Sequence, residues 1–317
     1  MLQLEKNMIH FFVKKSTILF ISLFVVATIT FFLMHMIPGD PFTNDQAIPE
    51  EVLRSIHKYY GLDQPLFIQY AKYLERIVHF DLGPSLKYQG RTVNEIIAEG
   101  FPVSFALGIE SLFISLIGGI ALGAIAAIYH QRWQDHVALF IAILGISVPS
   151  FLFGTLLQYL FAMKWDIFPI ARWDSFSYTI MPAITLAAVP LAVIARLTRA
   201  NLIEVLQQDY ILTARLKGLN TFQIIVRHAI RNALLPVITY IGPLTAAVFT
   251  GSFVIEKIFG IPGLGQWVVV SISNRDYPMI MGMTIFYSAI LLLCVFIVDL
   301  IYCLIDPRIK LNPASNG

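Results

Sequence analysis

Six long stretches without any Asp, Glu, Lys or Arg constrain the fold of this chain more than any other feature of its sequence. A helix that crosses the hydrocarbon core of a bilayer needs about 20 predominantly apolar residues in a row. Surface helices of soluble proteins, in contrast, carry charged side chains on the face that is turned to water. The six stretches are Ser16 to Gly39, Ser111 to Gln131, His136 to Met163, Ser175 to Ala195, Asn232 to Ile255 and Tyr277 to Val298. They predict an all-α membrane protein with six transmembrane helices.

Composition excludes two soluble domains, which a length of 317 residues would otherwise suggest. Hydrophobic residues make up 57% of the chain and charged residues only 13%. Soluble domains average about 45–50% apolar and about 25% charged residues. The membrane interpretation therefore agrees with both the total composition and its distribution along the chain.

The distribution of basic residues orients the predicted helices, because short cytoplasmic loops of membrane proteins are enriched in Lys and Arg. With the N-terminus in the cytoplasm, the short outer loops hold only Lys164, Arg172, Lys257 and Arg275. The inner side then holds Lys6, Lys14, Lys15, Arg132, Arg196, Arg199, Arg215, Lys217, Arg227, Arg231, Arg308 and Lys310. We therefore expect both termini in the cytoplasm. Since topology accounts for these basic residues, no nucleic-acid partner is expected.

The chain is expected to divide into segments along these boundaries. They are a cytoplasmic tail (1–15), the first span (16–37), an extracytoplasmic helical segment (38–101), a core with the other five spans (102–305) and a cytoplasmic tail (306–317). In the outer segment, Pro49 and Pro65 are typical of first helical turns, and Thr92 with Glu95 forms a capping box. These helices pack on the bilayer surface or on a partner, since about 60 residues bury only a small core. A passive connecting loop is the alternative.

Prolines and one acidic residue within the predicted spans are candidates for lining a translocation path. Pro149, Pro190 and Pro243 are expected to interrupt the third, fourth and fifth spans, and such breaks are tolerated where neighbouring groups or water satisfy the backbone. Glu110 lies inside the second span, where an ionisable side chain is costly and indicates a function by default. Either it lines the path or it hydrogen-bonds a neighbouring helix.

No pattern for nucleotide binding, metal binding or catalysis occurs in the sequence. G-x-x-x-x-G-K-[ST] is absent, and the seven histidines form no H-E-x-x-H. The glycine-rich stretch 260–265 lacks the lysine of a phosphate loop, and we expect a turn there before a surface helix around Gln266 to Asn274. A membrane-embedded hydrolase would need a nucleophile and a base facing each other, and no intramembrane His or Cys forms such a pattern with Glu110. We expect no cofactor and no enzymatic activity.

The loop between the fourth and fifth spans is expected to form a helical hairpin. Asp209 is the expected cap of a first helix from Tyr210 to Lys217, and Gly218 supplies a left-handed stop. A second helix then starts at Asn220 or Thr221 and reaches Asn232.

One face of this hairpin carries features of a docking helix. Tyr210, Ala214 and Gly218 recur at helical spacing and would offer an aromatic side chain beside small residues to a groove on a cytosolic partner. The alternative is a helix held at the membrane surface through Arg215, Lys217, Arg227 and Arg231.

Several segments resemble one known family. Asp209 to Leu219 (DYILTARLKGL) resembles the signature loop of binding-protein-dependent ABC importer permeases, and Arg227 to Pro236 (RHAIRNALLP) continues it in the manner of peptide transporters. Leu212, Thr213 and Ala214 stand where the general pattern has E-A-A. Further similar segments are Pro38 to Pro41, Gly61 to Pro65, Phe80 to Ser85, Thr250 to Glu256, Gly260 to Gly265, Asn274 to Tyr277 and Asp306 to Arg308. Together they are similar to the B-type permease subunit of oligopeptide and dipeptide systems.

The resemblance implies a function and a set of partners. The chain would be the permease subunit of a bacterial inner-membrane importer for oligopeptides, working by alternating access. It would pair with a second permease, two cytosolic ABC ATPases that hydrolyse ATP, an extracytoplasmic solute-binding protein, the lipid bilayer and the peptide. The loop 201–235 would couple to the ATPases through Asp209, Tyr210, Thr213, Ala214, Arg215, Lys217 and Gly218. An importer of dipeptides, nickel or another small solute is the alternative within the family, and a passive channel is the alternative outside it.

Overall fold

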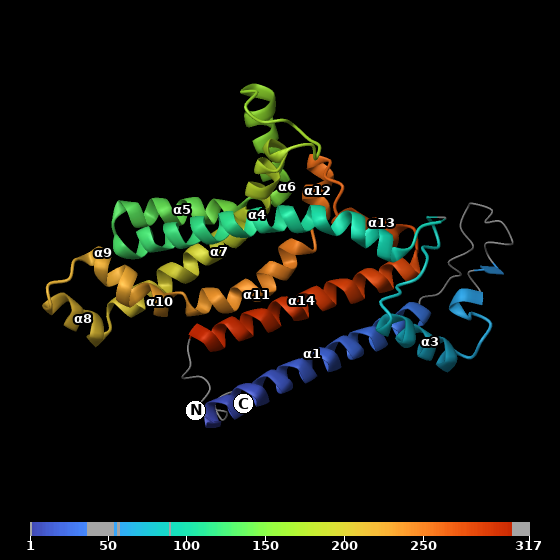
Figure 1. Ribbon diagram of the computed structural model, residues 1–317. Coiled ribbons are helices and arrows are strands. Elements are labelled where there is room, and N and C mark those ends of the chain that lie inside the picture. Colours follow the sequence, from blue (N-terminus) through green and yellow to red (C-terminus); the bar gives the residue numbers. More distant parts are fainter. Residues whose placement is uncertain (1, 37–53, 56–57, 89, 306–317) are drawn as a thin grey trace. The chain divides into compact units, whose positions relative to one another are not determined.

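A computed structural model describes residues 2–36, 54–55, 58–88 and 90–305, and these form helices joined by turns, with one isolated bridge between Pro84 and Thr92 (Figure 1). The helices are α1 (Leu2–Met36), α3 (Leu66–Val78), α4 (Val93–Ile128), α5 (Trp133–Ser147), α6 (Ser150–Leu157), α7 (Ile180–Leu206), α8 (Asp209–Leu216), α9 (Thr221–Ile224), α10 (Ile230–Ala233), α11 (Leu235–Phe249), α12 (Phe253–Phe259), α13 (Gly265–Ser273) and α14 (Tyr277–Ile305). A π-helix (Gln158–Lys164) extends α6, a 3-10 turn (Phe176–Tyr178) precedes α7, and a second π-helix (Ile225–Ala229) joins α9 to α10. The predicted all-α class is confirmed. The helix expected after Pro49 begins outside the described residues.

Four single helices within the described residues are long and apolar enough to cross a membrane: α1, α4, α7 and α14. Two bent pairs qualify only if each pair counts as one span. One joins α5 to α6 and its π-helical extension at 107°, and the other joins the stretch Thr221–Ala233 to α11 at 53°. The six predicted spans are therefore reached only when both bent pairs are included.

The three prolines expected to interrupt spans behave differently. Pro149 lies at the sharp bend before α6, and the preceding Val148 is extended, with φ −92° and ψ 122°. The residue before a proline is disfavoured in the helical region, which explains the break. Pro190 and Pro243 instead lie inside the continuous helices α7 and α11. The predicted interruption is confirmed at Pro149 and wrong at the other two.

The fifth predicted span, from Asn232 to Ile255, is shorter in the structure. The helix α11 covers only Leu235–Phe249, and Gly251 then adopts φ +82° before the separate helix α12 begins. A glycine is suited to this left-handed backbone. The surface helix expected at Gln266 to Asn274 is confirmed as α13, within the usual uncertainty of helix ends.

The chain folds into two compact units, residues 1–103 with 263–293 and residues 104–262 with 294–317. In the first unit, the predicted capping box is confirmed, because Glu95 N donates to Thr92 Oγ1 (3.2 Å) and Thr92 N donates to Glu95 Oε2 (2.9 Å). The helix that it starts is α4, which runs on through Pro102. The helix predicted to start at this capping box is therefore present, but it continues into the second span, and the expected segment boundary at 101/102 falls inside it. Pro65 precedes α3 as predicted.

A buried carboxylate ties together distant parts of the first unit. Asp276, which is fully buried, precedes α14. Its Oδ1 accepts from the backbone N–H groups of Met279 (3.3 Å) and Leu86 (3.2 Å), and its Oδ2 accepts from the Ser85 hydroxyl. Beside it lies a core of buried apolar side chains, which are Val93, Ile96, Ile97, Leu264, Met279 and Met283.

Glycines let the helices of the second unit pack closely on α7. A Cβ added to Gly123 would lie 2.5 Å from the carbonyl oxygen of Ala195, and one on Gly145 would lie 2.5 Å from that of Ala188. Small residues at such crossings allow the backbones of membrane helices to approach. The helix α7 is thus held between α4 and α5, and its C-terminal end leads directly into the predicted hairpin.

Candidate functional site

The hairpin between α7 and α11 forms as two short helical arms joined by a tight turn. Gly218 ends the first arm with φ +80°, as predicted. Its N–H donates to the carbonyl oxygen of Arg215 (2.9 Å), and the N–H of Leu219 reaches that of Ala214 (3.4 Å). These bonds use carbonyl groups that the last turn of a helix leaves without partners.

The two helix starts of the hairpin differ from each other. At the second arm, Asn220 and Gln223 form a reciprocal capping box, with Gln223 N donating to Asn220 Oδ1 (2.8 Å) and Asn220 N donating to Gln223 Oε1 (3.1 Å). The expected helix start at Asn220 or Thr221 is thereby confirmed, with Asn220 as the N-cap and Thr221 as the first helical residue. The expected cap at Asp209 is wrong, because Gln208 occupies the N-cap position and Asp209 is already the first helical residue. There its carboxylate still complements the positive end of the helix dipole.

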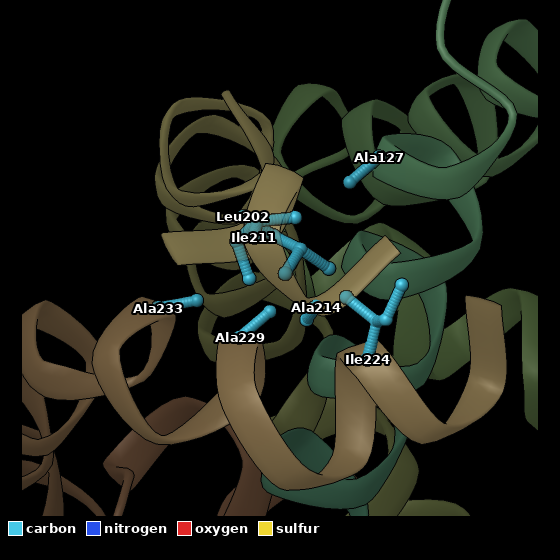
Figure 2. Close-up of a cluster of buried hydrophobic side chains, with 7 residues drawn as sticks. All are labelled: Ala127, Leu202, Ile211, Ala214, Ile224, Ala229 and Ala233. Atoms are coloured by element: carbon cyan, nitrogen blue, oxygen red, sulfur yellow. The ribbon is translucent and has the colours of Figure 1, made fainter. Parts of the chain in front are cut away.

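A core of small apolar side chains holds the two arms together and onto the adjacent helices. Figure 2 shows these side chains converging between the arms, α7 and the end of α4. They are Ala127, Leu202, Ile211, Ala214, Ile224, Ala229 and Ala233. Four of the seven are alanines, so the backbones approach closely and little side-chain freedom is lost on packing. Asn232 adds a cross-arm bond by donating from Nδ2 to the Tyr210 hydroxyl (2.9 Å).

The outer surface of the hairpin exposes large apolar side chains. Leu216 is 81% exposed and Phe222 is 74% exposed, on either side of the turn at Gly218. Leu212 and Val226 are also exposed, each one helical turn from one of these two residues. Arg215, Lys217 and Arg227 lie exposed among them. Contiguous exposed apolar side chains with a polar surround indicate a contact surface rather than a face turned to water.

This exposed surface differs from the face that the sequence pattern indicated. Ala214 points into the core and is not available to a partner, while Tyr210 is half-exposed and bonded to Asn232. The Thr213 hydroxyl donates to the carbonyl oxygen of Asp209 within its own helix (3.1 Å). The four apolar residues Leu212, Leu216, Phe222 and Val226 were missed. Their signal in the sequence was an i, i+4 apolar pair on each short arm, with polar residues next to each member of the pair.

A buried ion pair beside the hairpin was also missed. Arg199 of α7 donates to Asp135 of α5 from Nε to Oδ1 (2.7 Å) and from Nη2 to Oδ2 (2.8 Å). Asp135 is almost fully buried, and its Oδ2 also accepts from the N–H of Gln131 (2.9 Å). A two-pronged arginine–carboxylate pair fixes orientation as well as distance. The turn between α4 and α5 is therefore held firmly to α7, two turns before the hairpin begins.

The candidate path residues lie on different elements of the second unit. Glu110 is half-buried on α4 with the Thr179 side chain beside its carboxyl group. Pro149 lies between α5 and α6, Pro190 is buried in α7, and Pro243 is exposed on α11. Whether the four residues border one path stays a prediction. Among the residues that the structure describes, no group of three His, Cys, Asp or Glu side chains is placed to hold a metal ion.

Comparisons with known proteins agree on one family. Residues 119–311 match the family described as binding-protein-dependent transport system inner membrane component, and residues 8–108 match the N-terminal region of such components. The dipeptide transport system permease protein DppB of Bacillus subtilis is 50% identical over 96% of this chain and 99% of its own length. The oligopeptide transport system permease protein OppB of Salmonella typhimurium is 41% identical over 91% of this chain and 95% of its own length.

A solved structure shows the same fold at much lower identity. It is the MetNI methionine ABC transporter in an inward-facing conformation, with a TM-score of 0.53 and 14% identity. The match covers 67% of this chain and 96% of the compared chain. At this identity the likeness concerns the fold alone.

Proposed function

This chain belongs to the family of binding-protein-dependent transport system inner membrane components, and on that premise we propose that it is one membrane subunit of an ATP-driven peptide importer. It is a multi-pass protein of the inner membrane. The proposal adds to this a second permease subunit, two cytosolic ATPases and an extracytoplasmic binding protein as partners. Relatives named for dipeptide and for oligopeptide transport support a peptide as the substrate.

The observation that carries the coupling role is the exposed apolar surface of the hairpin. Leu216 and Phe222 lie outside the core, so a partner can bind their side chains without disrupting the packing of the hairpin. Burying two such side chains in a groove of a partner would contribute about 2 kcal/mol each. The exposed Arg215, Lys217 and Arg227 would add charge complementarity at the rim of the contact, which speeds association more than it strengthens it.

We infer a route by which force on the hairpin reaches the spans. The alanine core joins both arms to Leu202 of α7 and Ala127 of α4. The pair of Arg199 and Asp135 extends this connection to α5. A displacement of the hairpin would therefore move the ends of three helices together, since packed cores shift between discrete arrangements rather than deform continuously. The 107° bend at Pro149 is a place where α5 could move relative to α6.

Substrate size is the finer part of the proposal. Oligopeptides were the expected class, and the higher identity to a dipeptide permease favours dipeptides as the second candidate. Competition of labelled-tripeptide uptake by unlabelled dipeptide and pentapeptide, measured on the whole importer in vesicles, distinguishes the two. Preferential competition by one length assigns the class.

The coupling role is tested by the double variant Leu216→Ser, Phe222→Ser. Both side chains are exposed, so the fold and membrane insertion are expected to persist, while ATPase co-purification and ATP-dependent peptide uptake fall by at least about tenfold, which corresponds to 1.4 kcal/mol of contact energy. The matched control is Arg132→Ser, an exposed position in the turn between α4 and α5. Retained co-purification and uptake in the double variant would refute the docking surface. Uptake that needs no ATP in the unmodified assembly would instead favour a passive channel.

A further inference from the structure

The helix α3 is fastened along the last turns of α1 by aromatic and polar contacts. The Tyr70 hydroxyl bonds the Thr28 hydroxyl (2.7 Å), and its ring centroid lies 5.3 Å from that of Phe31. The Tyr73 ring also lies 5.3 Å from Phe31. At the end of α1, His35 Nε2 is 3.3 Å from Gln69 Oε1. One face of α3 is thus occupied by α1.

These contacts set the depth of α3 relative to the apolar span. The hydrocarbon core is about 30 Å thick, or about 20 helical residues, and counting from Lys15 this length ends near His35. Thr28 lies about 12 Å before the last residue of α1 at 1.5 Å per residue. A helix that touches Thr28 and Phe31 therefore lies beside the span at the membrane boundary, not in the water beyond it.

A second face of α3 carries an apolar stripe. Phe67, Ala71, Leu74 and Val78 align along one side at 3.6 residues per turn, and all of them are exposed except Leu74, which is half-buried. Phe67 is 79% exposed and Val78 is 74% exposed. Phe80, directly after the helix, is exposed as well. In water this stripe would be costly for a helix of its length.

The remaining face of α3 is polar and supports the rest of the outer segment. The Arg76 guanidinium lies 4.0 Å from the ring centroid of Tyr59 and 5.3 Å from that of Tyr60. Tyr59 in turn donates its hydroxyl to Asp81. The apolar stripe is therefore adjacent to the face on α1 and away from the face that carries the arginine.

We propose that α3 is an interfacial helix whose stripe of Phe67, Ala71, Leu74 and Val78 is covered by phospholipid. The apolar surface of α3 continues onto the span, because the ring centroids of Tyr70 and Phe32 lie 5.4 Å apart, and Phe32 and the neighbouring Leu33 are exposed on the membrane-spanning part of α1. Amphipathic helices of this kind lie with their apolar face about 5–10 Å into the boundary of headgroups and acyl chains. The sequence had left open whether this helix rests on the bilayer or on a partner protein.

Spin labels placed on the helix test this inference. In a background with Ser at positions 294 and 303, the variants Phe67→Cys, Ala71→Cys and Val78→Cys are labelled and reconstituted with the other importer subunits into vesicles of phosphatidylethanolamine and phosphatidylglycerol. The references are Leu33→Cys on α1 and Asp63→Cys, an exposed polar position before α3. Power saturation then compares accessibility to oxygen, which concentrates in lipid, with accessibility to a water-soluble nickel complex.

All three stripe positions are expected to show the oxygen preference of Leu33, several-fold above that of Asp63. A nickel accessibility equal to that of Asp63 would overturn the proposal, because the stripe would then face water. Protection from both reagents would also overturn it, because a protein partner would then cover the stripe. Ala71→Cys removes no large side chain, so its result does not depend on packing that Phe67→Cys or Val78→Cys could lose. Peptide uptake by each labelled importer shows that the importer has assembled.

Discussion

The segment around α3, predicted to be the outer segment, and the hairpin, predicted to lie on the inner side, are both short helical regions, but they are held together in opposite ways. The outer segment depends on buried polar groups that connect residues far apart in the sequence, such as Asp276 with Ser85. The hairpin depends on a core of alanines, and its capping bonds are local, such as that between Asn220 and Gln223. The outer segment should therefore be sensitive to loss of single polar atoms, and the hairpin to added volume.

The difference also concerns what each region offers to its surroundings. The outer segment pairs several polar groups internally, such as Asp276 with Ser85 and Tyr59 with Asp81, and exposes apolar side chains on α3. The hairpin exposes two pairs of large apolar side chains, Leu212 with Leu216 and Phe222 with Val226, on either side of its turn. A surface that binds and releases a protein partner needs a rigid support, which close backbone packing of alanines supplies. Substitutions in each region test whether the two are stabilised in these different ways.

The largest effect is expected from Asp276→Ala. The change leaves two backbone N–H groups and the Ser85 hydroxyl without their acceptor in a buried site, at a cost of about 3 kcal/mol or more in the free energy of unfolding. Asp276→Asn keeps one acceptor oxygen and should lose less. Thermal unfolding of the purified protein in detergent measures both, with Asp63→Ala as the exposed control. Equal stability of Asp276→Ala and the control would mean that the polar contacts do not hold the outer segment.

A smaller effect is expected from Ala229→Leu in the hairpin. Ala229 is fully buried among other small side chains, and three added carbon atoms should cost about 1–3 kcal/mol by overpacking. Limited proteolysis of the hairpin, together with thermal unfolding, measures the loss. Val226→Leu, an exposed change in the same π-helix, is the matched control and should be nearly neutral. If Ala229→Leu and Val226→Leu resisted proteolysis equally, the hairpin core would not be closely packed around Ala229.

The smallest effect is expected at high pH in the outer segment. Burial, together with the hydrogen bond to Asp81, raises the pKa of Tyr59 to about 12, against about 10 in an unfolded chain. Between these values the unfolded chain has lost the proton and the folded chain retains it, so stability falls as pH rises through this window. Tyr59→Phe cannot ionise there. Its free energy of unfolding should decline less than that of the wild type between about pH 10 and about pH 12, and parallel curves would contradict the assignment.

Local signals in the sequence predicted several details of the structure correctly. Gly218 ends a helix because the chain takes a left-handed backbone conformation there, which favours glycine. The side chains of Thr92 and Asn220 cap their helices by accepting hydrogen bonds from backbone N–H groups three residues further along. Such features depend on neighbours in the chain, so a pattern of residue types is enough to find them. Pro149 was recognised as a break in the same way, although Pro190 and Pro243 show that a proline alone does not decide it.

Two kinds of detail were predicted wrongly. Asp209 is a local error, because it has the right residue type for a cap but lies one position inside the helix. The other errors depend on distant partners, since Ala214 points inward where it packs with Ala229 of the second arm. The pairing of Arg199 with Asp135 joins residues on α7 and α5, and nothing in their spacing indicates it. The apolar pairs that include Leu216 and Phe222 are present in the sequence, but their exposure depends on which other side chains fill the core.

The residues alone were enough to identify an all-helical membrane protein of a transporter family, because a helix that crosses lipid needs a long apolar stretch and short family segments recur along the chain. The buried faces of the helices, the bend between α5 and α6, and the contact of α3 with α1 came from the three-dimensional packing. Membrane insertion depends on the total hydrophobicity of one segment, which can be read from its residues. Which face of that segment is buried depends instead on the other segments that pack against it.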